Sequence, residues 1–179
     1  NKTNDIIFNK KIIGNKENLI HVTNQNIKTN SKDILISYDK NILDKFENIS
    51  FNINKTFGSF EKDKNLFIKL NNINNTFFNH EGIQWKFILD KLKNNKNKNV
   101  FIFLENDLKF NNHIEEKIFI NILKKLPNNP NIFFIINSDN FNLNYYNSFP
   151  IIQLNKNKKY DLRFNTDLFN TSFEILTFN

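Results

Sequence analysis

The sequence predicts an α/β domain in which a mainly parallel sheet is covered by helices on both faces, a three-layer αβα arrangement. Two observations lead to this prediction. Short apolar runs without polar alternation are typical of strands that are buried on both faces, as parallel strands are. Segments with apolar residues at helical spacing separate these runs, and that alternation favours a parallel sheet. We expect the domain to span residues 5–155 and residues 156–179 to form a C-terminal appendage.

The first half of the chain is predicted to contain two helices and two strands. Apolar residues at helical spacing predict helices over residues 12–27 and 41–49. Apolar runs bounded by polar residues predict strands over residues 33–37 and 66–70.

Two further helices are predicted over residues 82–92 and 113–126. The second of them is the more strongly patterned, and its apolar positions include Ile114, Ile118 and Phe119. Pro127 follows directly, and proline cannot continue a helix.

The strands of the second half are predicted over residues 99–104, 131–136 and 151–154. The first of these, with the sequence NVFIFL, is the strongest strand prediction in the chain. We expect the phenylalanine-rich end, residues 164–178, to pair as an extra strand or hairpin.

The composition points to an extremely AT-rich genome, such as that of a reduced endosymbiont or an organelle. Asparagine, lysine, isoleucine and phenylalanine have AT-rich codons and dominate the 179 residues, whereas alanine is absent and Arg163 is the one arginine. The absence of cysteine excludes disulfides, thiolate zinc sites and iron–sulfur clusters. No apolar run approaches the roughly 20 residues of a membrane-spanning helix, so we expect a soluble protein without a membrane partner.

The sequence contains few groups that could hold a metal or a cofactor. His21, His80 and His113 lie on separate segments without the spacing of metal ligands, and we expect them at the surface. The three glycines are isolated, so no glycine-rich phosphate loop is present. The prediction is therefore that the protein has no metal site and no cofactor.

One acidic segment is a candidate for catalysis. Glu105 and Asp107 directly follow the predicted strand over residues 99–104. The carboxyl end of a central parallel strand is a place where a metal ion or an attacking water can be handled. The competing interpretation is an ordinary turn, because asparagine and aspartate favour turns.

Several segments, in order, resemble the AAA+ domain of bacterial DNA polymerase III clamp-loader subunits, of the delta-prime or gamma/tau type. Residues 11–17 (KIIGNKE) are similar to the opening of that domain, and residues 99–107 (NVFIFLEND) resemble its Walker B strand. Residues 122–127 (ILKKLP), followed by residues 131–136 (NIFFII), give the most specific similarity. The resemblance implies a P-loop NTPase fold of the AAA+ type.

The resemblance also implies that ATP chemistry has been lost. The expected phosphate loop contains Ser37, Lys40, Asp44 and Lys45 but no glycine, and Asp44 lies where the family has its phosphate-binding lysine. Other departures lie at the Walker B strand and at the arginine finger. Leu104 replaces the metal-binding aspartate although Glu105 matches the catalytic glutamate, and Phe149 replaces the arginine finger beside a retained Ser148.

The function implied by the resemblance is that of a catalytically silent subunit that assists sliding-clamp loading in DNA replication. Its partners would be other clamp-loader or polymerase subunits, contacted near Ser148 and Phe149, in the cytoplasm of a bacterium or reduced endosymbiont. With a net charge of +7, the chain could also contact DNA. The lysines expected to do so are Lys91, Lys93, Lys96 and Lys98.

Two other functions remain open from the residues themselves. One is an α/β enzyme, a transferase or a nuclease, that uses Glu105 and Asp107. The other is a basic structural component of an organellar ribosome.

Overall fold

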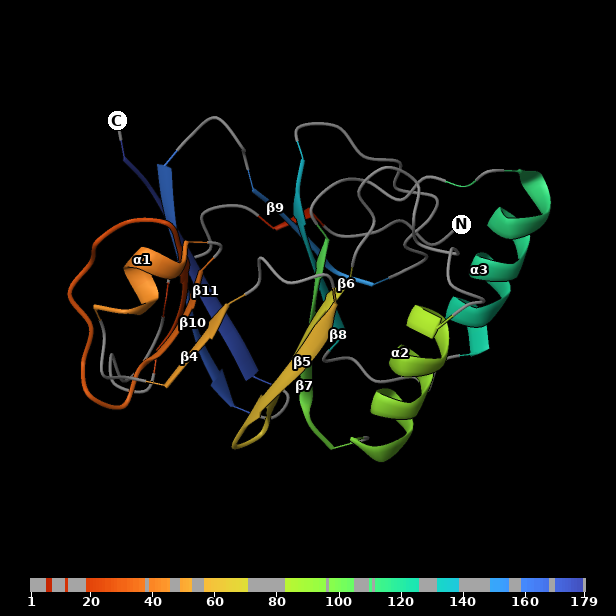
Figure 1. Ribbon diagram of the computed structural model, residues 1–179, viewed down its shortest axis with the longest axis horizontal. Coiled ribbons are helices and arrows are strands. Elements are labelled where there is room, and N and C mark those ends of the chain that lie inside the picture. The colour runs from red at the N-terminus through yellow and green to blue at the C-terminus, as the bar shows by residue number, and fades with distance from the viewer. Residues whose placement is uncertain are drawn as a thin grey trace. The chain divides into compact units, whose positions relative to one another are not determined.

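The computed structural model divides the chain into two compact units, each described here by itself (Figure 1). The first unit comprises Asn1–Ile7 and Thr56–Leu154, and the second comprises Phe8–Lys55 and Asn155–Asn179. Within them, the structure describes residues 6–7, 12, 19–37, 39–45, 49–52, 57–70, 83–95, 97–104, 110, 112–125, 132–138, 149–154, 159–167 and 170–178. The predicted α/β class is confirmed, but the described strands are divided between two sheets, whereas the sequence led us to expect one mainly parallel sheet.

The first unit contains a six-stranded sheet in the order β1-β9-β8-β7-β6-β5. Five of these strands run parallel, and only the edge strand β5 runs antiparallel to its neighbour β6. The strands are β1 (Ile6–Ile7), β5 (Gly58–Lys62), β6 (Asn65–Leu70), β7 (Asn99–Leu104), β8 (Ile132–Asn137) and β9 (Ile151–Leu154). The strands predicted over this part of the chain are confirmed, and β7 and β9 have the predicted bounds.

Two helices, α2 (Ile83–Asn94) and α3 (His113–Lys125), connect the parallel strands β6, β7 and β8. They cover one face of the sheet, where Ile88 and Leu92 of α2 and Phe119 of α3 join the core formed by the strands. Both helices were predicted, but the expected apolar positions Ile114 and Ile118 are 69% and 47% exposed. The reason is that α3 presents Phe119 to the sheet, and the helical period turns Ile114 and Ile118 away from it.

A row of phenylalanine rings crosses the opposite face of this sheet. Phe60, Phe67, Phe101 and Phe133 occupy directly opposed positions on β5, β6, β7 and β8. The ring centroids of successive pairs lie 6.0, 5.4 and 5.5 Å apart, and each pair is stacked. Aromatic neighbours of this kind stabilise a sheet because they bury large apolar areas across several strands.

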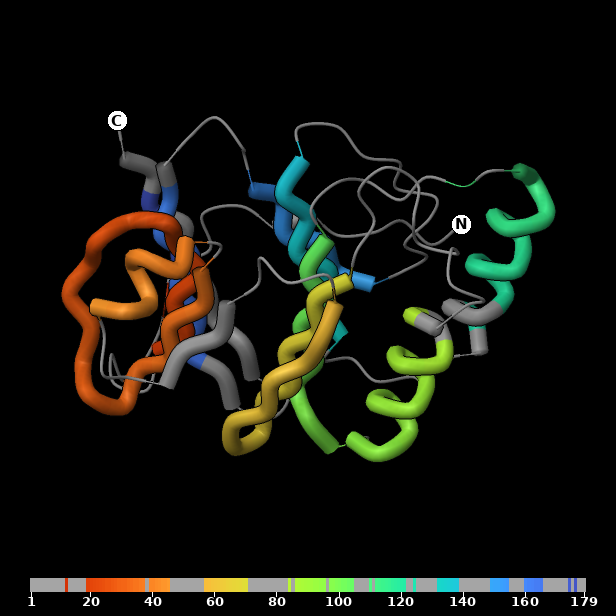
Figure 2. Tube along the Cα trace, in the orientation of Figure 1, coloured from red at the N-terminus to blue at the C-terminus, as the bar shows by residue number. Residues whose placement is uncertain are grey.

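The second unit contains a five-stranded sheet in the order β11-β10-β2-β3-β4. The strands are β2 (Ile20–Thr23), β3 (Ile34–Ser37), β4 (Ile49–Asn52), β10 (Lys159–Asp167) and β11 (Asn170–Phe178). β2, β3 and β4 are parallel, whereas the hairpin β10–β11 adds to β2 in the antiparallel direction. Figure 2 shows the blue part of β10 beside the red strand β2, with which β10 pairs. Of the two forms expected for the C-terminal end, an extra strand or a hairpin, the structure shows the hairpin.

Two helix predictions in this unit are wrong, because strands occupy part of each segment. Residues 12–27 were expected to form a helix, but β2 lies within them. In β2 the apolar residues alternate with His21 and Thr23, the period of a strand, and the pairing with β3 and β10 decides the conformation. Residues 41–49 were expected to form a second helix, but α1 (Lys40–Leu43) is a single turn and β4 begins at Ile49.

The short helix α1 is attached to β3 by an apolar contact. Ile42 and Leu43 pack on Leu35, with Ile27 at the edge of the same cluster. Asp39 caps the helix, because its side chain accepts a hydrogen bond from the Asn41 N–H.

Candidate functional site

Some of the described residues near the carboxyl edge of the parallel strands are polar. Lys69, which precedes the last residue of β6, and Asn137, which ends β8, are both buried. Gln153 of β9 donates a hydrogen bond from Nε2 to the Ser138 carbonyl oxygen, 2.9 Å away. Glu105 and Asp107, which follow β7, lie outside the described residues. The strand that precedes them, β7, lies between β6 and β8 in the sheet.

The segment expected to act as a phosphate loop follows β3 in the second unit. Ser37 is buried, and its Oγ donates to Asn24 Oδ1 and accepts from the Asp39 N–H, both at 3.0 Å. Lys40, Asp44 and Lys45 are exposed. Asp39 caps α1, so its carboxylate lies at the amino end of this helix. A bound phosphate would need free N–H groups at that place.

The phosphate-loop candidate and the Walker B candidate are carried by different sheets. Ser37 ends β3, which pairs with β2 and β4, whereas Leu104 ends β7, which pairs with β6 and β8. The two strands also belong to different compact units.

The lysines expected to contact DNA lie near the end of α2 and the start of β7. Lys93 is exposed, and Lys91 Nζ lies 5.8 Å from the centroid of the Phe87 ring. Lys98 Nζ forms an ion pair with Glu61 Oε2 at 3.0 Å. Lys96 lies outside the described residues.

The lysines Lys98 and Lys91 lower the pKa of Glu61. The hydrogen bond from Lys98 is the main cause that holds the pKa of Glu61 below its ordinary value, and the charges of Lys98 and Lys91 lower it further. The backbone of the β5–β6 turn lies beside the start of β7, because the Asn99 N–H donates to the Lys64 carbonyl oxygen at 2.7 Å. Lys91 and Lys98 belong to one segment of the sequence, whereas the position of Lys64 next to Asn99 is a result of the fold.

Of the residues expected at subunit contacts, Ser148 lies outside the described residues and Phe149 packs on the protein's own core. The Phe149 ring is half-buried, and its centroid lies 5.9 Å from that of Phe134 on β8.

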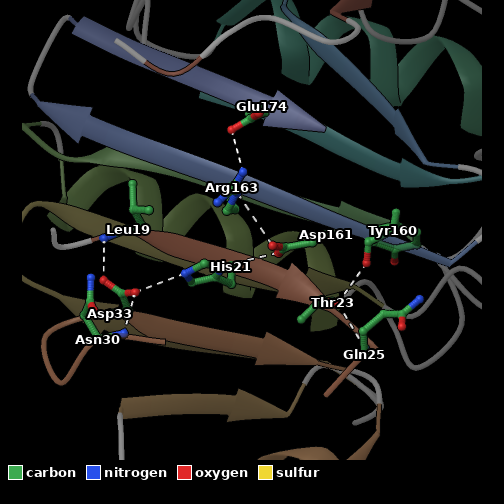
Figure 3. Close-up of polar contacts among 10 residues, drawn as sticks. All are labelled: Leu19, His21, Thr23, Gln25, Asn30, Asp33, Tyr160, Asp161, Arg163 and Glu174. Atoms are coloured by element: carbon green, nitrogen blue, oxygen red, sulfur yellow. Dashed lines mark hydrogen bonds and ion pairs between the residues drawn. The ribbon is translucent and has the colours of Figure 1, made fainter. Parts of the chain in front are cut away.

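An extended polar arrangement among the described residues was not predicted, and its members are buried or partly buried. It is a row of side chains across the second sheet, called here the charged row: Asp33, His21, Asp161, Arg163 and Glu174 (Figure 3). His21 Nε2 lies 3.1 Å from Asp33 Oδ2, and His21 Nδ1 lies 3.2 Å from Asp161 Oδ1. Arg163 continues the row, with Nε 3.7 Å from Asp161 Oδ2 and Nη2 2.6 Å from Glu174 Oε2.

The expectation that His21 lies at the surface is wrong, because His21 is only 3% exposed. The expectation is confirmed for His113, whose side chain is 74% exposed, and His80 lies outside the described residues. A signal for the charged row was present in the sequence. Asp161 and Arg163 alternate with the buried residues Tyr160 and Leu162, and such alternation is typical of a strand with one polar face.

The charged row does not form a metal site. The two carboxylates bind opposite nitrogens of the His21 ring, so the three side chains do not converge on one point. More generally, no group of three histidine, cysteine, aspartate or glutamate side chains in the described part of the chain is placed to hold a metal ion.

Comparisons with protein-family models, with curated proteins and with solved structures found no match to this chain. Among the described residues, no helix is both long enough and apolar enough to cross a membrane.

Proposed function

We propose that the chain is a catalytically silent α/β module of the clamp-loader type that works by binding other subunits, and that its first unit keeps part of a degenerate P-loop NTPase fold. The support is the order β7, α3, β8 in the first unit, since these elements carry the segments that resemble the clamp-loader domain. The placement of β3 and β7 in different sheets weighs against a nucleotide site formed by both strands. The proposal is therefore of a role in assembly, without ATP hydrolysis.

The observation that carries the proposal is the closed amino end of α1. The N–H groups of Asp39 and Asn41 donate to Ser37 Oγ and to Asp39 Oδ1. Those of Ile42 and Leu43 donate to the Asp39 carbonyl oxygen at 3.2 and 3.3 Å. A phosphate would have to displace these bonds and approach a carboxylate of like charge, which makes nucleotide binding unfavourable.

The test combines affinity capture with a nucleotide titration. We expect the tagged chain to capture clamp-loader or polymerase subunits from its source cell, and a fluorescent ATP analogue to show no saturable binding. A matched variant, Ile114→Asp with Ile118→Asp, removes the exposed apolar pair on α3 and tests whether that helix contributes to the capture. Capture of ribosomal proteins alone, or of nothing, would contradict the clamp-loader proposal, and tight ATP binding would contradict its silent character.

A contact with DNA is a separate part of the proposal, and Lys93 tests it. Lys93→Ala removes an exposed positive charge in the last turn of α2, which also holds Lys91. We expect weaker binding to every duplex sequence and a salt dependence reduced by about one unit of slope. Fluorescence anisotropy at several salt concentrations measures both, with Lys40→Ala on α1 as the control. A sequence-selective loss, or an equal loss in the control, would refute the contact.

The second candidate is an enzyme that uses Glu105 and Asp107. The observation that favours it is the position of β7 between two parallel neighbours, since the carboxyl ends of such strands are common places for active sites. The buried Lys69 lies near the same edge on β6. In this case Mn²⁺ would raise the melting temperature and Glu105→Gln would abolish the rise, whereas the silent module predicts no response to the metal.

A further inference from the structure

Among the described residues, the exposed large hydrophobic side chains are Leu89, Ile114 and Ile118. All three belong to the helices that cover one face of the first unit's sheet, Leu89 to α2 and the two isoleucines to α3 (Figure 1). Single exposed apolar side chains are common on protein surfaces. A group of them on one layer of the structure is instead typical of a binding surface.

The packing of Phe87 shows which side of α2 carries Leu89. The Phe87 ring lies edge-on to the ring of Phe57, with the two centroids 5.4 Å apart. Phe57 directly precedes β5, which lies beyond β6 on the side away from β7. Leu89 follows Phe87 by two positions, a rotation of about 200° around the helix. Leu89 therefore lies on the opposite side of α2, toward α3.

The two helices run in the same direction, because each connects the end of one parallel strand to the start of the next. On α2, Leu89 follows the core residue Ile88 by one position and lies toward α3. On α3, Ile118 precedes the core residue Phe119 by one position, so it lies on the opposite side of its helix, toward α2. Ile114 lies one turn before Ile118 on the same side. The three exposed side chains, called here the apolar strip, thus lie on the facing sides of the two helices.

Exposed lysines border the apolar strip. Lys86 and Lys93 lie one turn before and one turn after Leu89 on α2, and Lys117 lies on α3 directly before Ile118. All three lysines are exposed. These positive charges would attract a partner that carries negative charges around an apolar centre.

The acidic residues of the two helices do not cancel these charges. Asp90 is exposed on α2, but it is a single negative charge against three lysines. Glu115 and Glu116 of α3 are half-buried, and they lie one turn before Phe119, on the side of the helix that faces the sheet. Glu116 Oε2 also lies 3.8 Å from His113 Nδ1. The described charges next to the apolar strip are therefore positive in balance.

We propose that the apolar strip binds an acidic, amphipathic helix of a partner protein. This inference rests on the proposed function, because it names the chemistry of a partner that the module would bind. The apolar face of the partner helix covers Leu89, Ile114 and Ile118, and its carboxylates face the bordering lysines. The apolar side chains favour a protein segment over DNA, because the phosphate groups that dominate DNA binding offer them no apolar contact.

The test is fluorescence anisotropy with two synthetic peptides of about 20 residues, a length that allows a helix to form. The acidic peptide carries leucines along one helical face and glutamates elsewhere, and the basic peptide carries lysines in place of the glutamates. We expect the full 179-residue chain to bind the acidic peptide saturably and about tenfold or more tightly than the basic one, with weaker binding at higher salt. Equal binding of the two peptides, or no saturable binding of the acidic one, would overturn the proposal.

Variants at exposed positions locate the binding on the apolar strip. Ile114→Ser with Ile118→Ser removes apolar contacts without a change of charge, and Lys117→Glu reverses a charge beside them. Each should weaken binding of the acidic peptide about tenfold or more. Lys28→Glu makes the same charge change at an exposed position of the second unit and should leave the affinity nearly unchanged. Equal losses from the two lysine variants, or an unchanged affinity in the serine variant, would show that net charge alone attracts the peptide and would overturn the proposal.

The affinity for duplex DNA distinguishes the two classes of partner. The serine variant should bind DNA as the wild type does, because it keeps every lysine. A loss of DNA affinity that matches the loss of peptide affinity would assign this surface to nucleic acid and overturn the proposal. The peptide assay contains neither clamp-loader subunits nor nucleotide, so its result and that of the capture experiment can fail separately.

Discussion

Replacing Phe101 by alanine is expected to lower the free energy of unfolding of the first unit by about 3–5 kcal/mol. Phe101 is completely buried in the central strand β7. Its ring stacks against Phe67 on one side and Phe133 on the other, with centroid separations of 5.4 and 5.5 Å. The substitution removes a large apolar side chain and leaves a cavity between two rigid strands that cannot collapse to fill it.

Phe60→Ala is the matched control for this prediction. Phe60 belongs to the same row of rings but lies half-buried on the edge strand β5, so we expect a smaller loss, about 1–2 kcal/mol. Urea unfolding followed by circular dichroism, with hydrogen exchange of the β6–β8 amides to assign the change to the first unit, measures both variants. Equal losses, or a loss below about 1 kcal/mol for Phe101→Ala, would refute the central role of this ring.

Asp33→Ala is expected to have a comparable effect on the second unit, a loss of about 3–5 kcal/mol. The residue is only 2% exposed, and its carboxylate accepts from the backbone N–H groups of Leu19 and Asn30 as well as facing His21. Alanine leaves these backbone donors buried without an acceptor and removes one of the two carboxylate partners of the His21 ring. Both consequences cost more than the net value of the intact contacts.

Asp44→Ala separates this effect from a general loss of negative charge. Asp44 is an exposed residue at the end of α1, and its removal should change the unfolding free energy by less than about 0.5 kcal/mol. Denaturant unfolding at neutral pH compares the two variants, and hydrogen exchange in β2 and β10 assigns the loss to the second unit. If Asp33→Ala lowered the free energy of unfolding no more than Asp44→Ala does, the contacts of the Asp33 carboxylate would not stabilise the second unit as expected.

The elements of the first unit were predictable because their local patterns are strong. A strand buried on both faces needs a continuous apolar run, and NVFIFL of β7 meets this need without help from any neighbour. α3 was predictable from its helical spacing and from Pro127. Its orientation was not, because only the contact of Phe119 with the sheet decides which side of the helix is buried.

The strand β2 and the charged row were missed for one common reason. Isoleucine is so frequent in this chain that helical spacing arises by coincidence, as over residues 12–27. The feature that makes Ile20–Thr23 a strand is its pairing with β10, whose residues lie about 140 positions away. Long-range pairing leaves little trace in the local pattern of one segment, so a buried His21 could not be told from an exposed one.

The amino-acid sequence by itself determined the α/β class, the strands β6 to β9, the two long helices and the C-terminal hairpin, because each depends on a local pattern of apolar residues. The tertiary structure alone decided how the strands are shared between two sheets. It placed Ser37 and Leu104, which were expected to serve one nucleotide site, on separate sheets. The physical reason is that backbone hydrogen bonds between strands are alike for every sequence, so the choice of partner depends on how whole faces pack together and not on the pattern of either strand.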